Sequence, residues 1–136
     1  MVKFLIAYLG VALVFFFIDC IWLMFIAKNF YKSQIGVLLL DNPKLGVAAV
    51  FYLIFIAGIV IFAVMTGLRH GQWYTAMLFG ALFGLMCYGT YDLTNLATLK
   101  GWTLKVAVID IVWGTFLTGT ASTGGYFAVK WFFPTV

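Results

Sequence analysis

Residues 4–27 read FLIAYLGVALVFFFIDCIWLMFIA, and apolar runs of this kind decide the fold of the chain. Asp19 is the one charged side chain in this run. A helix needs roughly 20 apolar residues to cross about 30 Å of hydrocarbon, because it rises about 1.5 Å per residue. Residues 45–66, 73–99 and 106–129 form three more runs that are long and apolar enough. The sequence therefore predicts four transmembrane helices.

The composition supports the same fold class. Of the 136 residues, 65% are hydrophobic and 9% are charged, whereas an average soluble domain is roughly half apolar and about a quarter charged. So few charges cannot cover a soluble particle without leaving large apolar patches exposed. The runs are also too long and too uniformly apolar for barrel strands, which alternate. We expect an all-α, polytopic integral membrane protein, a four-transmembrane-helix bundle, with residues 1–136 forming a single membrane domain.

The basic residues favour one orientation in the membrane. The loops at residues 28–44 and 100–105 carry five lysines, whereas the other loop and the two ends of the chain carry three basic residues. Cytoplasmic loops are enriched in Lys and Arg, so both loops are expected in the cytoplasm and both termini in the periplasm. The net charge of +4 indicates contact with anionic membrane lipids rather than nucleic-acid binding. The five lysines are Lys28, Lys32, Lys44, Lys100 and Lys105, and the other three are Lys3, Arg69 and Lys130.

Three aspartates, Asp19, Asp92 and Asp110, lie inside the predicted spans, nine, eight and five residues from the nearest loop lysine. They therefore share one half of the membrane, roughly 8–14 Å below the same rim. An ionisable side chain inside a span costs about 2.5–3.5 kcal/mol and usually faces the bundle, where it marks function. No basic residue lies at this depth in the sequence. Three neighbouring carboxyl groups cannot all ionise there, so we expect a retained proton, a bound cation or entering water.

Polar side chains gather around the middle aspartate of the three. Tyr88, Asp92 and Asn95 share one face of a helix, and Tyr91 lies beside them. These neighbours can donate hydrogen bonds and still leave Asp92 free to hold a ligand or a proton. We therefore expect Asp92 to be the ligand-facing member of the three.

The other two aspartates each begin an Asp-x-x-Trp unit, which pairs Asp19 with Trp22 and Asp110 with Trp113. In antiparallel helices each carboxylate lies near the depth of the tryptophan on the opposite helix. Two crossed Asp–Trp hydrogen bonds would then clamp the first span to the fourth and satisfy buried polar groups without further purpose. This structural role and a role in ligand binding both stay open for Asp19 and Asp110.

Small residues recur at four-residue spacing in the last two spans. The third span has Gly80 and Gly84, a pattern that lets a neighbouring helix approach closely. The fourth has a ridge for which close packing within the bundle is favoured over a dimer face or a solute path. The ridge consists of Gly114, Thr118, Ser122 and Gly125.

The sequence also argues against several kinds of site. His70 is the only histidine and falls in a predicted loop, which excludes bis-histidine haem, zinc and di-iron centres. No Lys lies within a predicted span, so a retinal Schiff base is excluded, and no P-loop, Rossmann or Gly-x-Ser-x-Gly motif occurs. Cys20 and Cys87 lie in apolar runs and are interpreted as inert packing residues. We expect no cofactor and no metal.

Residues 88–102, YGTYDLTNLATLKGW, resemble the signature of a bacterial family of predicted membrane proteins, domain of unknown function 2177. The resemblance extends over essentially the whole chain and implies a small, multi-pass protein of the bacterial inner membrane with four helices. It implies no reaction. The other matching elements are the Asp19/Trp22 unit, the Asp110/Trp113 unit and Phe51-Tyr52-Leu53.

Three functions follow from these patterns. The favoured one is binding or transport of a proton, a cation or a small cationic solute, and transport would require a homodimer because four spans are few for a two-gated path. The second is a lipid-modifying enzyme whose carboxylates act with or without Mg²⁺ below the lysine rim, although no Asp-x-x-x-Asp pair occurs. The third is a non-catalytic scaffold held by Asp–Trp clamps. The expected binding residues are Asp19, Asp92, Asp110, Asn95, Tyr88, Tyr91, Trp22 and Trp113.

Overall fold

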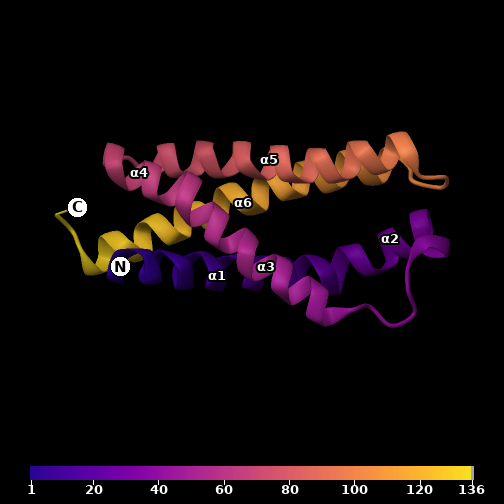
Figure 1. The fold of residues 1–136 in the computed structure, drawn as a ribbon, viewed down its shortest axis with the longest axis horizontal. Helices are drawn as coiled ribbons and strands as arrows, with labels where there is room; N and C mark the ends of the chain where they lie inside the picture. The colour runs from indigo at the N-terminus through magenta and orange to yellow at the C-terminus, as the bar shows by residue number, and fades with distance from the viewer. Residues whose placement is uncertain (136) are drawn as a thin grey trace.

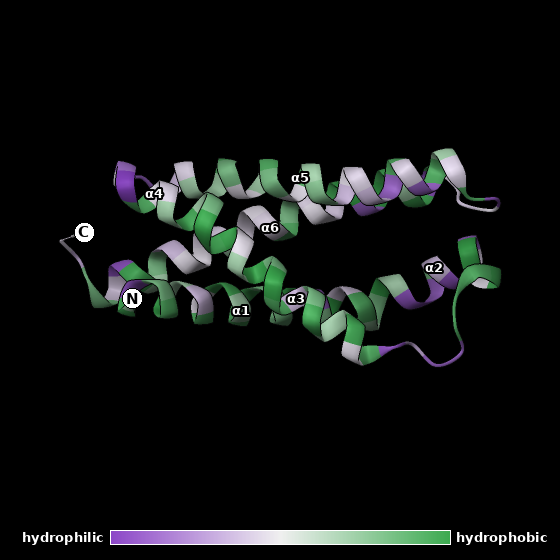
Figure 2. Cartoon of the chain, in the orientation of Figure 1, coloured by the Kyte–Doolittle hydropathy of each residue, from purple (hydrophilic) through white to green (hydrophobic). Residues whose placement is uncertain are grey.

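The computed structural model describes residues 1–135, which form an all-helical bundle with no strand in this part of the chain (Figure 1). Four helical segments are long and apolar enough to cross a membrane, which confirms the predicted fold class. Figure 2 shows hydrophobic residues along most of the helices and hydrophilic ones mainly at the turns, in α2 and in the C-terminal half of α5. The elements are α1 (Val2–Trp22), the π-helical turn η1 (Leu23–Ala27), α2 (Lys28–Ile35), the 3-10 turn η2 (Gly36–Leu38), α3 (Leu45–Ile59), the π-helical turn η3 (Val60–Val64), α4 (Met65–His70), α5 (Trp73–Thr98) and α6 (Leu104–Phe132).

The first helical segment is longer than the expected span at residues 4–27. Helical structure continues through η1 and α2 as far as Leu38, so most of the expected loop at 28–44 is helical. Ala27 and Ile35 are buried, and Tyr31 lies between them at four-residue spacing on the same face. This face packs against the bundle and stabilises the extension, which ends before the Asn42-Pro43 turn.

Helices α5 and α6 run antiparallel and pack closely along most of their length (Figure 1). A Cβ atom on Gly80 would lie 2.7 Å from the Ser122 Cβ, and one on Gly84 would lie 2.7 Å from the Thr118 Oγ1. Ser122 Oγ also donates a 2.8 Å hydrogen bond to the Ala76 carbonyl across the pair. These glycines therefore admit the side chains of α6, as their spacing predicts.

Helix α6 also packs against α1, at the end of the bundle that holds both termini (Figure 1). A Cβ atom on Gly124 would lie 2.6 Å from Val14 Cγ2, and one on Gly125 would lie 2.5 Å from Val11 Cγ2. The small residues of α6 are thus used for contacts with both α5 and α1. This confirms the prediction that the ridge serves packing within the bundle.

The second span crosses the bundle at an angle (Figure 1). Its α4 end packs tightly against α5, because a Cβ atom on Gly67 would lie 2.6 Å from the Ala76 Cβ. The Phe83 ring covers Gly58 at the level where α3 gives way to η3. Beyond that level α3 diverges from α5 toward the end that holds α2 (Figure 1). The divergence opens the space in which the candidate site lies.

Candidate functional site

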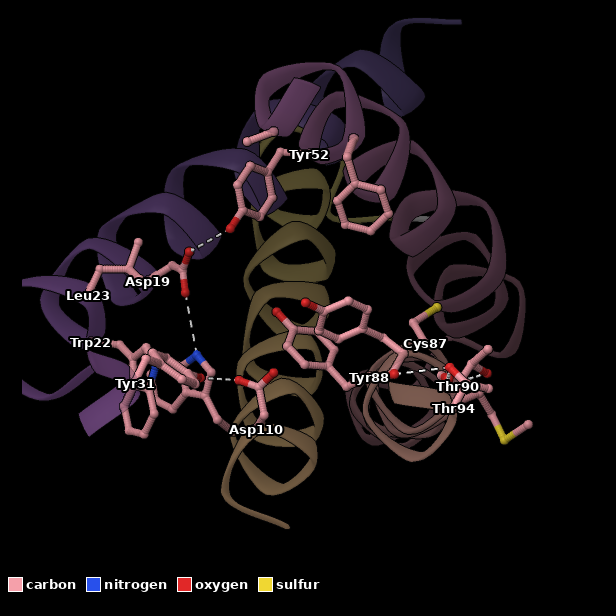
Figure 3. Close-up of a pocket in the computed structure, with 15 residues that line it drawn as sticks. Asp19, Trp22, Leu23, Tyr31, Tyr52, Cys87, Tyr88, Thr90, Thr94 and Asp110 are labelled. Carbon is pink, nitrogen blue, oxygen red and sulfur yellow. Dashed lines mark hydrogen bonds between the residues drawn. The ribbon is translucent and has the colours of Figure 1, made fainter. Parts of the chain in front are cut away.

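A cavity of about 820 Å³ lies where α3 diverges from α5 (Figure 3). It lies in the half of the bundle nearest the loops at 39–44 and 99–103, the half in which the sequence placed the aspartates. Five helical elements and one π-helical turn contribute to its wall. The lining residues are Asp19, Trp22, Leu23, Tyr31, Ala48, Phe51, Tyr52, Met86, Cys87, Tyr88, Thr90, Tyr91, Thr94, Asp110 and Trp113.

Asp19 is a buried carboxylate with donors from two other helices. Trp113 Nε1 on α6 donates to its Oδ1 at 3.4 Å, and the Tyr52 hydroxyl on α3 donates to its Oδ2 at 3.4 Å (Figure 3). The first of these bonds confirms one of the two predicted Asp–Trp pairs. Both bonds are longer than the usual 2.7–3.2 Å, so they orient the carboxylate without saturating its acceptor capacity.

Asp110 has a different partner from the one expected. The Tyr31 hydroxyl on α2 donates to its Oδ1 (Figure 3), and within residues 1–135 no hydrogen bond joins it to Trp22. The Trp22 ring instead stacks on that of Trp113, with centroids 4.2 Å apart and planes inclined by 10°. The predicted second crossed pair is therefore wrong. The bond to Trp22 does not form because the helical extension brings the Tyr31 hydroxyl to the Asp110 carboxylate. The two indole rings are then free to stack on each other.

Asp92 does not line the cavity, in contrast with its expected role as the ligand-facing acid. Its side chain is fully buried, and its polar neighbours are Asp110 and the Trp102 indole. In the described part of the chain neither of its carboxyl oxygens has a hydrogen-bond partner, and nor does Trp102 Nε1. Asp92 therefore lies behind the wall, and the acids exposed to the cavity are Asp19 and Asp110.

The other expected binding residues divide in the same way. Tyr88 and Tyr91 line the cavity, whereas Asn95 does not. The Tyr88 ring lies directly over Gly114, where a Cβ atom would come within 2.5 Å of its Cδ1. The absence of a side chain at Gly114 therefore lets the Tyr88 ring pack against the backbone of α6. The four-residue spacing of Gly114 and Thr118 does not predict this contact.

Several lining residues were not expected from the sequence. Tyr31 was placed in a loop, although its four-residue spacing from Ala27 and Ile35 is the signal that could have located it on the inner face of a helix. Phe51 and Tyr52 belong to the pattern shared with the family, but the sequence does not predict them as site residues. With these three, seven aromatic side chains line the cavity. They are Trp22, Tyr31, Phe51, Tyr52, Tyr88, Tyr91 and Trp113.

The charge and the opening of the cavity define what it can hold. The wall carries two carboxyl groups, and the lining residues include no Lys, Arg or His. Phe51 on α3 and Met86 and Tyr91 on α5 are each more than half exposed, so the cavity opens between these helices, toward the bilayer. Among residues 1–135 no group of three His, Cys, Asp or Glu side chains is arranged to hold a metal ion. The arrangement is acidic, aromatic and laterally open.

The chain was also compared with known proteins. No match was found among curated proteins or among solved structures. A family model described as predicted membrane protein (DUF2177) matches residues 4–127, a range that includes every residue lining the cavity. The match confirms the resemblance seen in residues 88–102. The chain therefore belongs to the DUF2177 family of predicted membrane proteins.

Proposed function

We propose that this membrane protein binds a molecule that carries an organic cationic group, and that Asp19 and Asp110 hold this group in the cavity. One observation carries the proposal: the wall has two carboxyl groups and no basic side chain. Buried charges in proteins are normally paired. A cationic ligand supplies the charge that the wall of this cavity lacks.

The aromatic wall supports an organic cation rather than a bare metal ion. Cations over the faces of Trp, Tyr and Phe gain about 0.5–2 kcal/mol, and quaternary ammonium groups are recognised in this way. The stacked Trp22 and Trp113 rings lie close to Asp19, which accepts a bond from Trp113. Hard cations such as Ca²⁺ instead require about six to eight oxygen ligands. The cavity volume of about 820 Å³ also falls within the usual range of about 300–1,000 Å³ for small-molecule pockets.

We further propose that the cavity faces the cytoplasmic leaflet of a bacterial inner membrane. Its wall lies near the loops that carry Lys44 and Lys100 and near Lys105 at the start of α6, and loops and helix ends rich in lysine are typically cytoplasmic. The lysines would contact anionic headgroups, while the acidic wall lies deeper, beyond their reach. A cationic molecule could then reach the cavity from the cytoplasmic side or from that leaflet.

Binding can be tested with the purified protein in maltoside micelles and radiolabelled tetraethylammonium. We expect saturable binding that weakens by at least about tenfold in Asp19→Asn and in Asp110→Asn, because each change removes one charge from the wall. Asp41→Asn is the matched control, since it makes the same chemical change at an exposed loop residue. Thermal unfolding of each variant checks that the bundle stays folded.

Two results would contradict the proposal. Absence of saturable binding to the folded wild-type protein would overturn the proposal. Binding that falls equally in Asp41→Asn would show that general surface charge, rather than the cavity, attracts the cation.

A further inference from the structure

We infer that the ligand is a single-chain cationic amphiphile, whose head lies in the acidic cavity and whose hydrocarbon tail lies in a neighbouring apolar groove. This inference rests on the proposed function and adds the class of molecule. The groove has a volume of about 280 Å³ and adjoins the cavity at Met86, which lines both. Its lining residues are Phe62, Phe79, Leu82, Phe83 and Met86.

The chemistry of the groove suits a hydrocarbon chain. All five lining side chains are apolar, so the groove offers a ligand neither charge nor a side-chain hydrogen bond. The Phe62 and Phe83 rings stack with centroids 5.5 Å apart, which joins η3 to α5. Phe62, Phe79 and Leu82 are each about half exposed, so the groove opens to the bilayer as the cavity does.

The two spaces follow one another along α5. Groove residues begin at Phe79, cavity residues end at Thr94, and Met86 lies between them. With a rise of about 1.5 Å per residue, the stretch of α5 from Phe79 to Thr94 is about 22 Å long, and its part from Phe79 to Met86, along the groove, is about 10 Å long. An amphiphile can therefore place its polar head and part of its tail in separate, adjoining environments.

The order of the two spaces matches the orientation of a lipid. The acidic cavity lies toward the lysine-bearing loop after α5, whereas the groove begins at Met86, near the middle of α5, and extends toward the opposite end of the helix. A molecule bound with its head at Asp110 would keep its tail pointing toward the bilayer centre. It could enter sideways between α3 and α5 without turning over, with its head in the cavity and the end of its tail at or beyond the middle of the bilayer.

A photoreactive probe tests where the tail lies. The probe is a dodecyltrimethylammonium that carries a diazirine near the end of its chain, bound to the full chain in maltoside micelles and cross-linked by light. Mass spectrometry is expected to locate the adducts on the groove residues of η3 and α5. Leu82→Trp, which fills the groove, should reduce these adducts at least fivefold. Leu78→Trp is the matched control, because Leu78 is a leucine of similar exposure one turn away on α5 that does not line the groove.

Binding of the tailless cation separates the two proposals. If Leu82→Trp leaves both adducts and amphiphile affinity unchanged while tetraethylammonium still binds, the tail site is wrong and the proposed function stands. If neither cation binds the folded wild-type protein, both fail. A dodecyl sulfate that displaces the probe as well as unlabelled dodecyltrimethylammonium does would overturn the assignment of a cationic head.

Discussion

Trp113 Nε1 donates a 3.4 Å hydrogen bond to Asp19 Oδ1, across 94 residues of sequence. The bond joins α6 to α1 at the wall of the cavity, and the Tyr52 hydroxyl adds a donor from α3 to the same carboxylate. Three helices are thus linked through one acidic side chain. The link orients Asp19 toward the cavity, and its loss should affect both stability and binding.

Trp113→Phe tests the structural part of this link. The change keeps an aromatic ring beside Trp22 and removes the indole N–H, so the free energy of unfolding should fall by about 0.5–1.5 kcal/mol. Thermal unfolding in maltoside micelles measures the loss. Trp131→Phe is the control, because Trp131 is 82% exposed near the end of α6. Equal stability of Trp113→Phe and the wild type would show that the bond contributes nothing.

Tyr31→Phe tests the partner of Asp110. Removing the hydroxyl takes away the donor that the helical extension α2 supplies, so we expect a loss of about 0.5–1.5 kcal/mol in unfolding free energy. Loosening of α2 should also speed proteolysis after Lys32. Tyr74→Phe, at the exposed start of α5, makes the same change away from the cavity. Identical proteolysis rates in Tyr31→Phe and Tyr74→Phe would contradict the anchoring role.

Asp92→Asn separates the acid behind the wall from the acids within it. The amide is nearly isosteric and costs less to bury than a carboxylate without a partner, so the unfolding temperature should stay the same or rise. Tetraethylammonium binding should also change less than twofold, whereas Asp110→Asn should weaken it strongly. Loss of binding in Asp92→Asn, with the fold intact, would restore Asp92 as the ligand-facing residue.

Gly84→Ala tests the packing of α5 on α6. The new Cβ would lie 2.7 Å from Thr118 Oγ1, so the helices must separate, at a cost of about 1–3 kcal/mol. Gly46→Ala provides the comparison, because no atom lies within 4 Å of its Cβ position and alanine favours the helix there. The unfolding temperature should therefore fall in the first variant and stay constant or rise in the second. A similar response in both would show that the α5–α6 contact tolerates an added methyl group.

Cysteine accessibility tests the orientation. In a variant without Cys20 and Cys87, Lys100→Cys should react with a membrane-impermeant maleimide only after the cells are opened, and Arg69→Cys should react in intact spheroplasts. The lysine distribution is the physical basis of this expectation. Labelling of Lys100→Cys alone in intact spheroplasts would reverse the orientation and leave the cavity unchanged.

The limits of sequence-based prediction are clearest in the first span. Its apolar run predicts a helix, yet the helical segment continues to Leu38 because Ala27, Tyr31 and Ile35 find packing partners on the rest of the bundle. Residues 28–35, which include Lys28, Asn29 and Lys32, are too polar for the sequence to predict that the transmembrane helix continues through them. The same extension places the Tyr31 hydroxyl beside Asp110. Tyr31 therefore takes the place of Trp22, which the sequence predicts as the hydrogen-bond donor to Asp110.

The sequence by itself determined that four helices cross the membrane, that small residues bring α5 and α6 together, and that three carboxyl groups share one depth. Length, apolarity and position along a helix axis can all be counted from the residues. Only the tertiary structure decided that Asp19 and Asp110 face the cavity while Asp92 lies behind its wall. The rotation of each helix about its axis depends on packing, and in the first segment the π-helical turn η1 also turns the side chains that follow it, such as Tyr31, by about 100° per extra residue. Which side chains meet therefore depends on how the helices pack around the space left where α3 diverges from α5.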